Sequence, residues 1–359
     1  MEKLDKKTRS QYRTKVEEDF PAKMSFGPLE FTKKLSMRYG ENPGYPAAFY
    51  AEKGATGPTM ATFSVHQEGN KGLSYINVGD MDLGQRLIKK LVRLYPDQKS
   101  CVLIKHEMPS GVAKGKNGLD VYESAWGCDP LSNFGSVDVF NYTIDTPLAE
   151  IIVEPMRNVE VVFAPDYTRE ALKILETRKP LRVVQMDGNP ADPSHDVDWE
   201  VKRVEGGLLV QKRFDSRIQS AGDVDIVSRR QPSDEEIEAA LFCWTVACFT
   251  RSNAIVIGTS DRIHGIGSGQ RSRIDATEDA IRLSGRGYGP RGCVLASDAF
   301  MPFPDVVERA AEHGITAVIY PLGSVRDAEV IARADELGLA MIATKKPGQS
   351  DSERCFLHR

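Results

Sequence analysis

Residues 159–187 read VEVVFAPDYTREALKILETRKPLRVVQMD, and this stretch decides the fold class. The β-branched run at 159–165 and the apolar run at 181–187 each have the length and composition of a buried strand. Between them, residues 169–178 carry apolar side chains at helical spacing. The stretch therefore predicts a strand, a helix and a second strand in succession, the building unit of layered α/β architecture.

The same alternation extends toward the N-terminus. Further strands and helices are expected at CVLIKH (101–106), ESAWGCDPLSN (123–133), VDVFNYTI (137–144) and PLAEIIVEPMRN (147–158). The first thirty residues are highly charged and end in PAKMSFGPLE (21–30), whose prolines and glycine are typical of an arm or linker. We therefore expect a charged N-terminal arm at 1–30 and a first α/β unit at 31–225.

A second α/β unit is expected at 226–359, after a polar, proline-bearing connection at 188–204 that leads into the strand GGLLVQK (206–212). Its helices and strands are predicted at DEEIEAALFCWTVACF (234–249), SNAIVIG (252–258), DVVERAAEHG (305–314), TAVIYPLG (316–323), DAEVIARADELG (327–338) and LAMIAT (339–344). Both units repeat strand and helix in the same rhythm, so a duplicated fold is plausible, although no residue-level repeat accompanies it.

The composition excludes several classes of protein. The 359 residues, 41% hydrophobic and 27% charged, suit two compact globular units. No apolar run approaches the roughly 20 residues of a membrane-spanning helix, and the N-terminus lacks the apolar segment of a secretory signal, so we expect a soluble, cytoplasmic protein with no membrane partner. The net charge of −4 provides no broad cationic surface, and we expect no nucleic-acid partner.

The cysteines and histidines form no metal-binding pattern. The six cysteines include no C-x-x-C pair, Cys243 and Cys248 have the wrong spacing for a zinc knuckle, and the six histidines lie far apart. We expect reduced thiols and no zinc.

Lys105 and His106 close the apolar strand at 101–106 and precede Pro109 and Gly111. Both side chains should lie where a strand gives way to a loop, which is where α/β sheets bind ligands. Histidine can transfer a proton near neutral pH, and a partly desolvated lysine can donate to a developing oxyanion. The dipeptide alone is weak evidence, because a surface pair or a buried structural histidine would read the same way.

Two further segments could bind anions. Arg38 and Tyr39 precede Gly40 and a turn-prone Glu-Asn-Pro, and together they offer a guanidinium, a phenol and exposed amides to a phosphate; a surface arginine beside a half-buried tyrosine is the alternative. The segment GIGSGQRSR (265–273) is glycine-rich and cationic, so its backbone could approach an anionic or planar ligand. Its glycine spacing is not a dinucleotide fingerprint, and such a segment is more often a turn.

The segment SDAFMPFPD (297–305) sets two aromatic rings and two carboxylates among prolines. It could form a platform for a flat heterocycle, with a carboxylate accepting from the ring nitrogens. Alternatively, Asp305 begins and caps the following helix with Phe303 as a hydrophobic staple.

Taken together and in order, these segments resemble AICAR formyltransferase, where AICAR is 5-aminoimidazole-4-carboxamide ribonucleotide; this is the transformylase half of the bifunctional enzyme that ends purine (IMP) synthesis. The matching pieces are LSMRYGENP (35–43), GLSYIN (72–77), CVLIKHEMPSGVA (101–113), DPLSNFG (129–135), EVVFAPDY (160–167), GGLLVQ (206–211), RSNAIVIG (251–258), GIGSGQRSRID (265–275), SDAFMPFPD (297–305), GITAVIYPLGSVRDAEVI (314–331) and RCFLH (354–358).

The resemblance implies a fold and a reaction. The fold is two cytidine-deaminase-like three-layer subdomains in tandem, assembled as a homodimer with shared active sites, without zinc and with room for a structural potassium ion. The reaction is formyl transfer from 10-formyltetrahydrofolate to the 5-amino group of AICAR. The family's cyclohydrolase domain has no counterpart in the matched segments, so ring closure to IMP is expected to need another protein.

The resemblance also implies residue roles. The catalytic residues would be Lys105, His106 and Asn253. The nucleotide would be bound by Arg38, Tyr39, Gly135, Glu160, Arg273, Arg354, Phe356 and His358. The folate would be bound by Phe300, Pro302, Phe303 and Asp305.

The sequence departs from the family pattern in several loops. Met108-Pro109-Ser110-Gly111 replaces Asn-Pro-Cys-Gly, Gly44-Tyr45 replaces His-Gln, and Cys248 and Phe249 stand where basic residues are usual. Two alternatives follow: a nucleotide-binding paralogue without turnover, or formyl transfer to a different phosphorylated amine.

Overall fold

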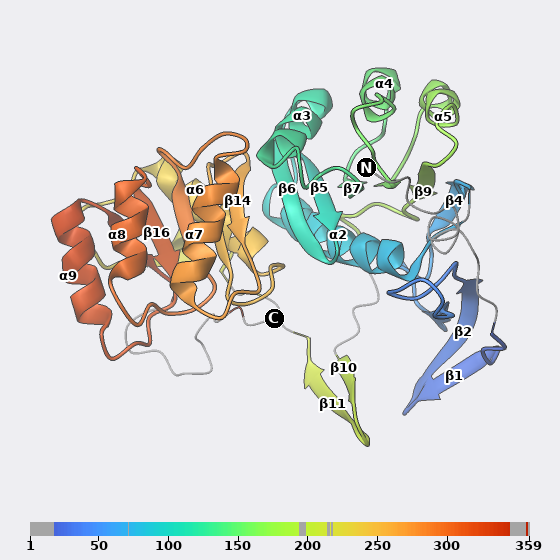
Figure 1. Cartoon of the computed structure of the whole chain (residues 1–359), viewed down its shortest axis with the longest axis horizontal. Helices are drawn as coiled ribbons and strands as arrows, with labels where there is room; N and C mark the ends of the chain where they lie inside the picture. Colours follow the sequence, from blue (N-terminus) through green and yellow to red (C-terminus); the bar gives the residue numbers. More distant parts are fainter. Residues whose placement is uncertain are drawn as a thin grey trace, which may run out of the picture. The chain divides into compact units, whose positions relative to one another are not determined.

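The structure is a computed structural model of the chain. It describes residues 18–70, 72–193, 199–213, 216, 218–344 and 357, which Figure 1 draws in colour along the sequence. The chain divides into two compact units, one made of Met1–Ser110, Lys114–Glu123 and Leu131–Ser194 and the other of Gly111–Ala113, Ser124–Pro130 and His195–Arg359. The expected boundary between residues 225 and 226 stays a prediction.

The first unit is built on a six-stranded mixed sheet. Its strands lie in the order β4-β9-β8-β7-β5-β6; β7, β8 and β9 are parallel, while β4 and β5 run antiparallel to their neighbours β9 and β7. The strands are β4 (Ser64–Gln67), β5 (Lys99–Lys105), β6 (Met108–Gly115), β7 (Val137–Phe140), β8 (Val161–Ala164) and β9 (Arg182–Gln185). Residues 159–187 form β8, a helix and β9, as predicted.

Helices cover both faces of this sheet. They are α2 (Tyr75–Leu94), α3 (Gly118–Cys128), α4 (Thr146–Ile152) and α5 (Arg169–Leu175). Figure 1 shows α3, α4 and α5 on one side of the strands and the long α2 on the other. Gly84 of α2 lies so close to the sheet that a Cβ there would be 2.5 Å from Cγ2 of Val139 and 3.3 Å from Cγ1 of Ile104. The unit therefore has three layers.

Two small antiparallel sheets stand apart from the six-stranded ones. The first joins β1 (Lys23–Phe26), β2 (Leu29–Ser36) and β3 (Ala48–Glu52), so regular structure begins inside the segment expected to be an arm. The second is a hairpin of β10 (Trp199–Val204) and β11 (Gly207–Lys212). β11 is the predicted strand, whereas β10 lies in the segment predicted as a connection, where β-branched residues alternate with charged ones.

The second unit repeats the architecture of the first. Its strand order is β12-β17-β16-β15-β13-β14, with β15, β16 and β17 parallel and β12, β13 and β14 antiparallel to their neighbours. The strands are β12 (Asp225–Ile226), β13 (Ile255–Gly258), β14 (Ile263–Gly267), β15 (Val294–Ser297), β16 (Ala317–Tyr320) and β17 (Ala340–Ala343). The helices are α6 (Asp234–Ala247), α7 (Arg273–Ser284), α8 (Asp305–Glu312) and α9 (Asp327–Leu337), and a 3₁₀ turn, η1, spans Ala221–Asp223.

Each element of the second sheet and its helices has a counterpart at the same place in the first. α2 precedes β5 as α6 precedes β13, and α3, α4 and α5 alternate with the parallel strands as α7, α8 and α9 do. This common topology confirms the predicted α/β class in tandem subdomains.

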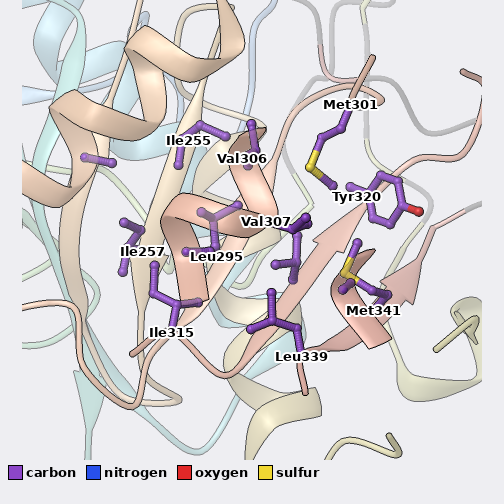
Figure 2. Close-up of a cluster of buried hydrophobic side chains, with 14 of the residues drawn as sticks. Ile255, Ile257, Leu295, Met301, Val306, Val307, Ile315, Tyr320, Leu339 and Met341 are labelled. Carbon is purple, nitrogen blue, oxygen red and sulfur yellow. The ribbon is translucent and has the colours of Figure 1, made fainter. Parts of the chain in front are cut away.

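The core of the second unit follows the two-residue period of its strands. Ile255, Ile257 and Leu295 point to one face, where they meet Val306 and Val307 of α8 in a buried cluster (Figure 2). The residues between them, such as Val256 and Ala296, are also fully buried. Continuous burial on both faces explains why these strands read as unbroken apolar runs.

Within the residues described, no helix is long and apolar enough to cross a membrane.

Candidate active site

Lys105 and His106 lie at a tight turn between two strands. β5 ends at Lys105 and β6 begins at Met108, so His106 and Glu107 alone connect them. Both connecting residues have positive φ, 54° and 57°, as a type I′ hairpin turn requires. The predicted loop is therefore a two-residue turn, held in a backbone region that residues other than glycine seldom adopt. His106 is exposed on it.

The Lys105 ammonium reaches the segment that precedes β7. Its Nζ donates to the carbonyl oxygen of Phe134 at 2.5 Å, and a Cβ on Gly135 would lie 3.7 Å from the same nitrogen. Gly135 has a φ of 91°, and its N–H donates to the carbonyl of Asn158. Two residues expected in one site from separate motifs thus lie side by side.

A buried carboxylate on α2 supports the turn. Asp80 is 3% exposed and accepts from the backbone N–H of His106 at 3.2 Å and of Glu107 at 2.5 Å. Burial raises the pKa of Asp80 to about 6, the two N–H groups lower it, and the negative charges of Glu107 and Glu160 raise it further. No sequence motif singled out Asp80.

Glu160 lies beside the start of α2. Asn77 donates from Nδ2 to Glu160 Oε2 at 3.1 Å, and Arg182 Nη1 lies 3.9 Å from the same oxygen. Asn77 also forms a capping box with Ser74, so the helix terminus fixes its position. Arg182 donates from Nε to the carbonyl of Gly72 at 3.2 Å, which orients its guanidinium toward the carboxylate.

Arg38 and Tyr39 contact each other. Nη2 of Arg38 donates to the Tyr39 hydroxyl at 2.7 Å, and the guanidinium lies over the tyrosine ring. Tyr39 is buried, with 8% of its surface exposed. Burial lowers the pKa of Arg182, the negative charge of Glu160 raises it, and the positive charge of Arg38 lowers it again.

The turn after Tyr39 differs from its predicted role. The Gly40 N–H, expected to be free for a phosphate, donates to the carbonyl of Tyr45 at 2.7 Å. Gly44 in this turn has a φ of 88°, a conformation that glycine adopts without strain. The side chain of Tyr45 is 68% exposed and lines a shallow pocket with Tyr75. The altered loop thus shapes the surface beside Arg38, and the Gly40 N–H is not available to bind a phosphate.

Asn253 and Arg273 belong to a hydrogen-bonded cluster in the second unit. Arg273 donates from Nη2 to Asn253 Oδ1 at 2.7 Å and from Nη1 to a carboxylate oxygen of Asp298. Ser252 donates to the other oxygen of Asp298, and Asn253 donates from Nδ2 to the carbonyl of Gln270 at 2.9 Å. Asp298 is fully buried, so this carboxylate fixes the direction in which Arg273 points.

The glycine-rich segment has a different role from the one considered. A Cβ on Gly265 would lie 2.1 Å from the carbonyl oxygen of Ala280, and one on Gly267 would lie 1.8 Å from that of Ala276. Both glycines belong to β14 and face α7, so what approaches their backbone is a helix. The close packing brings the first residue of α7, Arg273, next to the sheet.

The two carboxylates of the segment SDAFMPFPD (297–305) lie in different surroundings. Asp298 is buried beneath the cluster and is not part of a platform, because Arg273 and Ser252 occupy its oxygens. Asp305 begins α8, as one alternative predicted, but Pro304 is the N-cap residue, and Asp305 Oδ1 accepts from the N–H of Val306 at 2.9 Å. Burial raises the pKa of Asp305.

The two aromatic rings of this segment remain accessible. Phe300 is 37% exposed and Phe303 is 49% exposed, with Pro302 between them and the Arg326 guanidinium over the Phe303 ring. Of the C-terminal segment, Leu357 is described: it is buried and its N–H donates to the carbonyl of Asp298 at 2.9 Å. Arg354, Phe356 and His358 lie outside the described residues.

Among the residues described, no group of three or more His, Cys, Asp or Glu side chains is placed to hold a metal ion. No disulfide bond joins the described cysteines, which are Cys101, Cys128, Cys243, Cys248 and Cys293. Burial raises the pKa of Cys128 and Cys293 to about 12, which keeps both thiols protonated at neutral pH.

In the first unit, the turn that carries Lys105 and His106 lies against the buried Asp80 carboxylate, and Arg182 lies beside Glu160. Ionisable groups gathered in this way are typical of enzyme sites. The sequence model described as AICARFT/IMPCHase bienzyme matches residues 3–283, and the chain belongs to this family. Membership gives it an enzymatic role in purine biosynthesis. The match begins well before residue 31, where the motif resemblance starts, and ends before the segment that carries Phe300 and Asp305.

Proposed function

We propose that this chain transfers the formyl group of 10-formyltetrahydrofolate to the 5-amino group of AICAR, the transformylase reaction of its family. The observation that carries the proposal is the turn at His106, where a histidine and a lysine are held beside Gly135 and above a buried carboxylate. Formyl transfer needs a proton acceptor and an oxyanion partner at one place, and the turn offers both.

The acceptor is a poor nucleophile, because its aromatic amine is conjugated to a carboxamide. In the proposed reaction His106 removes the amine proton during attack on the formyl carbon, and Lys105 stabilises the negative oxygen of the tetrahedral intermediate. Asn253, held by Arg273 and Gln270, orients the amine and the carboxamide.

The first unit supplies groups suited to the nucleotide. Arg38 and Tyr39 would bind the 5′-phosphate, and the like-charged Arg182 close to Arg38 strengthens the local positive potential. Glu160 would accept from the ribose hydroxyls next to Gly135, where the absent side chain leaves room. Asn77 and Arg182 hold the Glu160 carboxylate in place for this role.

The second unit supplies groups suited to the folate. Phe300, Pro302 and Phe303 would stack on the pterin, since two exposed rings beside a rigid proline present a flat apolar surface. Asp305 would accept from the amino-pyrimidine edge.

We also propose that the working form is a cytoplasmic homodimer. The β10–β11 hairpin exposes Trp199, Leu208 and Val210 by 46%, 47% and 51%, and the strand register puts these three on one face. An isolated hairpin is marginally stable in water, and grouped apolar side chains favour a protein partner, for which a second copy is the simplest choice. The described cysteines form no disulfide bond, which suits a reducing compartment. Sedimentation of the purified chain would reveal the dimer or exclude it.

The test is an assay with AICAR and 10-formyltetrahydrofolate, with the product separated by chromatography so that formyl-AICAR is distinguished from the ring-closed nucleotide. We expect formyl-AICAR to accumulate and His106→Ala to lower the rate by about 10²- to 10⁴-fold, the usual effect of losing a general base. His66→Ala, at an exposed histidine on β4, is the matched control.

Two results would contradict the proposal. One is wild-type protein that binds AICAR in calorimetry yet forms no product with this donor, which would identify a binding paralogue. The other is unchanged turnover in His106→Ala.

A further inference from the structure

The first turns of α2 send two side chains toward the proposed site. Asn77 and Asp80 are three residues apart, so they share one face of the helix. Asn77 reaches Glu160, and Asp80 reaches the turn that carries His106. The capping box at Ser74 and the close packing of Gly84 fix the helix at both ends of this segment.

The contact between Asp80 and the turn is bidentate. One carboxylate oxygen accepts from the N–H of His106 and the other from the N–H of Glu107. These are the two residues with positive φ, a conformation disfavoured for both side chains. Bonds from N–H to an ionised acceptor are the strong kind, so the carboxylate offsets the cost of the turn at the residues that need it.

We infer that Asp80 is a positioning residue, which fixes the β5–β6 turn so that His106 and Lys105 face the reacting atoms. The inference rests on the proposed function, because that function makes the turn the place of chemistry. Asp80 itself is buried, and both of its carboxylate oxygens accept from the backbone of the turn.

The charges around Asp80 oppose its ionised form. The negative charge of Glu107 acts on it from the turn, and that of Glu160 acts on it from the segment before β8. Burial and these two carboxylates hold the pKa of Asp80 near 6, above its usual 3.8, so its ionised form at neutral pH costs the fold stability. A residue whose only role was to stabilise the fold would not be expected to have a pKa shift that makes its ionised form costly.

The direction of the pKa shift of Asp80 distinguishes a positioning role from a purely structural one. Asp80→Asn removes the negative charge. The side-chain amide nitrogen takes the place of one carboxylate oxygen, so an NH₂ group then faces a backbone N–H donor of the turn. We expect turnover to fall by about 10- to 100-fold with little change in either KM, as for a small displacement of catalytic groups. We also expect the melting temperature at pH 7.5 to stay level or rise. Asp82→Asn, on the same helix at a half-exposed residue, is the control that leaves turnover unchanged.

A second variant tests the turn itself. Glycine adopts positive φ without strain, so with Glu107→Gly the turn should keep its conformation with less support from Asp80. We expect Asp80→Asn with Glu107→Gly to recover a large part of the turnover that Asp80→Asn loses. Should Asp80→Asn not fold, Asp80→Glu repeats the test, because it keeps the charge but displaces the carboxylate.

Amide hydrogen exchange of the peptide around His106 gives a readout independent of turnover. We expect faster exchange at His106 and Glu107 in Asp80→Asn, with the rest of β5 unchanged. Unchanged exchange at the turn, or full turnover in Asp80→Asn or Asp80→Glu, overturns the inference. A wild-type protein without formyl transfer refutes the proposed function instead, and the exchange result still decides whether Asp80 holds the turn.

Discussion

At the scale of single residues, a substitution at Asp298 is the most direct test of whether Asn253 and Arg273 of the second unit take part in the proposed reaction. Its buried carboxylate accepts from both Arg273 and Ser252, and Arg273 in turn holds Asn253. Asp298→Asn puts an NH₂ group against one of these donors and leaves the guanidinium without its charged partner. We expect formyl transfer to fall by about 100-fold because Arg273 and Asn253 lose their geometry.

Steady-state kinetics of Asp298→Asn, measured well below its melting temperature, checks this expectation. Asp275→Asn is the matched control, because Asp275 is an exposed residue in the first turn of the same helix as Arg273. Turnover at the wild-type level in Asp298→Asn would show that Asn253 and Arg273 keep their positions without the carboxylate.

The sequence drew attention to residues with unusual chemistry in a motif. Lys105 stood beside His106 at a strand end, and in the structure the Lys105 side chain lies next to Gly135. Asp80 carried no such signal, and Asn77 ends the matched segment GLSYIN (72–77) but had no role assigned to it, because a single polar residue on a helix is ordinarily solvated. Their burial depends on how α2 packs, which no local pattern encodes. Asp298 was visible in its motif, but only packing reveals that it lies under the site.

At the scale of elements, α2 is the least predictable part and the one that supports the first unit's site. The longest of the described helices, it buries polar side chains such as Gln85 and Lys90, so its apolar periodicity is interrupted. The parallel strands, by contrast, were readable because burial on both faces makes them continuously apolar. Helices α8 and α9 were also predicted, and both are followed by a glycine with positive φ, Gly314 or Gly338.

Gly84 gives a stability prediction for α2. Replacing glycine with alanine inside a helix ordinarily stabilises it by about 1 kcal/mol. In Gly84→Ala the new Cβ would lie 2.5 Å from Cγ2 of Val139, so overpacking should dominate and destabilise the protein by about 1–3 kcal/mol. The shorter side chain of Val139→Ala makes room for that methyl group. We therefore expect the double variant to be more stable than the two single changes predict when added.

Urea denaturation of the four proteins in this cycle measures the coupling. Strictly additive effects would mean that α2 moves away from the sheet instead of clashing with Val139. If α2 does move, turnover should fall along with stability, because Asn77 and Asp80 move with the helix.

At the scale of the whole molecule, two units share one topology but differ in how they use its turns. The β5–β6 turn is supported by a carboxylate on α2. In its counterpart between β13 and β14 the carboxylate comes from the turn, since Thr259 donates to Asp261 and Arg262 pairs with Asp261. A common scaffold with separate side-chain chemistry explains why strand order repeats without any repeat in sequence.

Two ionisable groups of the first unit, Asp80 and Asp138, have raised pKa values, whereas His264 and Glu236 of the second have lowered ones; Asp305 of the second unit shifts upward, as the first unit's carboxyls do. In the first unit, burial raises the pKa of Asp138 to about 7, with Ser136 and Tyr122 donating to its carboxylate, and raises that of Asp80 to about 6. In the second unit, burial lowers the pKa of His264, while Arg230 and Ser233 lower that of Glu236 to about 2 against the effect of burial. A raised carboxyl pKa means that the folded state binds protons more tightly than the unfolded chain.

Acid should therefore affect the two units in opposite directions. As the pH falls from 8 toward 5, Asp138 and Asp80 take up protons in the folded state, whereas in the unfolded chain they would stay ionised until about pH 4; the first unit gains stability. Over the same range His264 is protonated more readily in the unfolded chain, and below pH 4.5 so is Glu236; the second unit loses stability. Amide exchange in β7 and β8, compared with β15 and β16 after correction for intrinsic rates, measures both trends. Asp138→Asn should weaken the pH dependence of exchange in the first unit. The control Asp120→Asn, at an exposed residue of α3, should leave that pH dependence unchanged. The same trend with pH in both units would contradict the prediction.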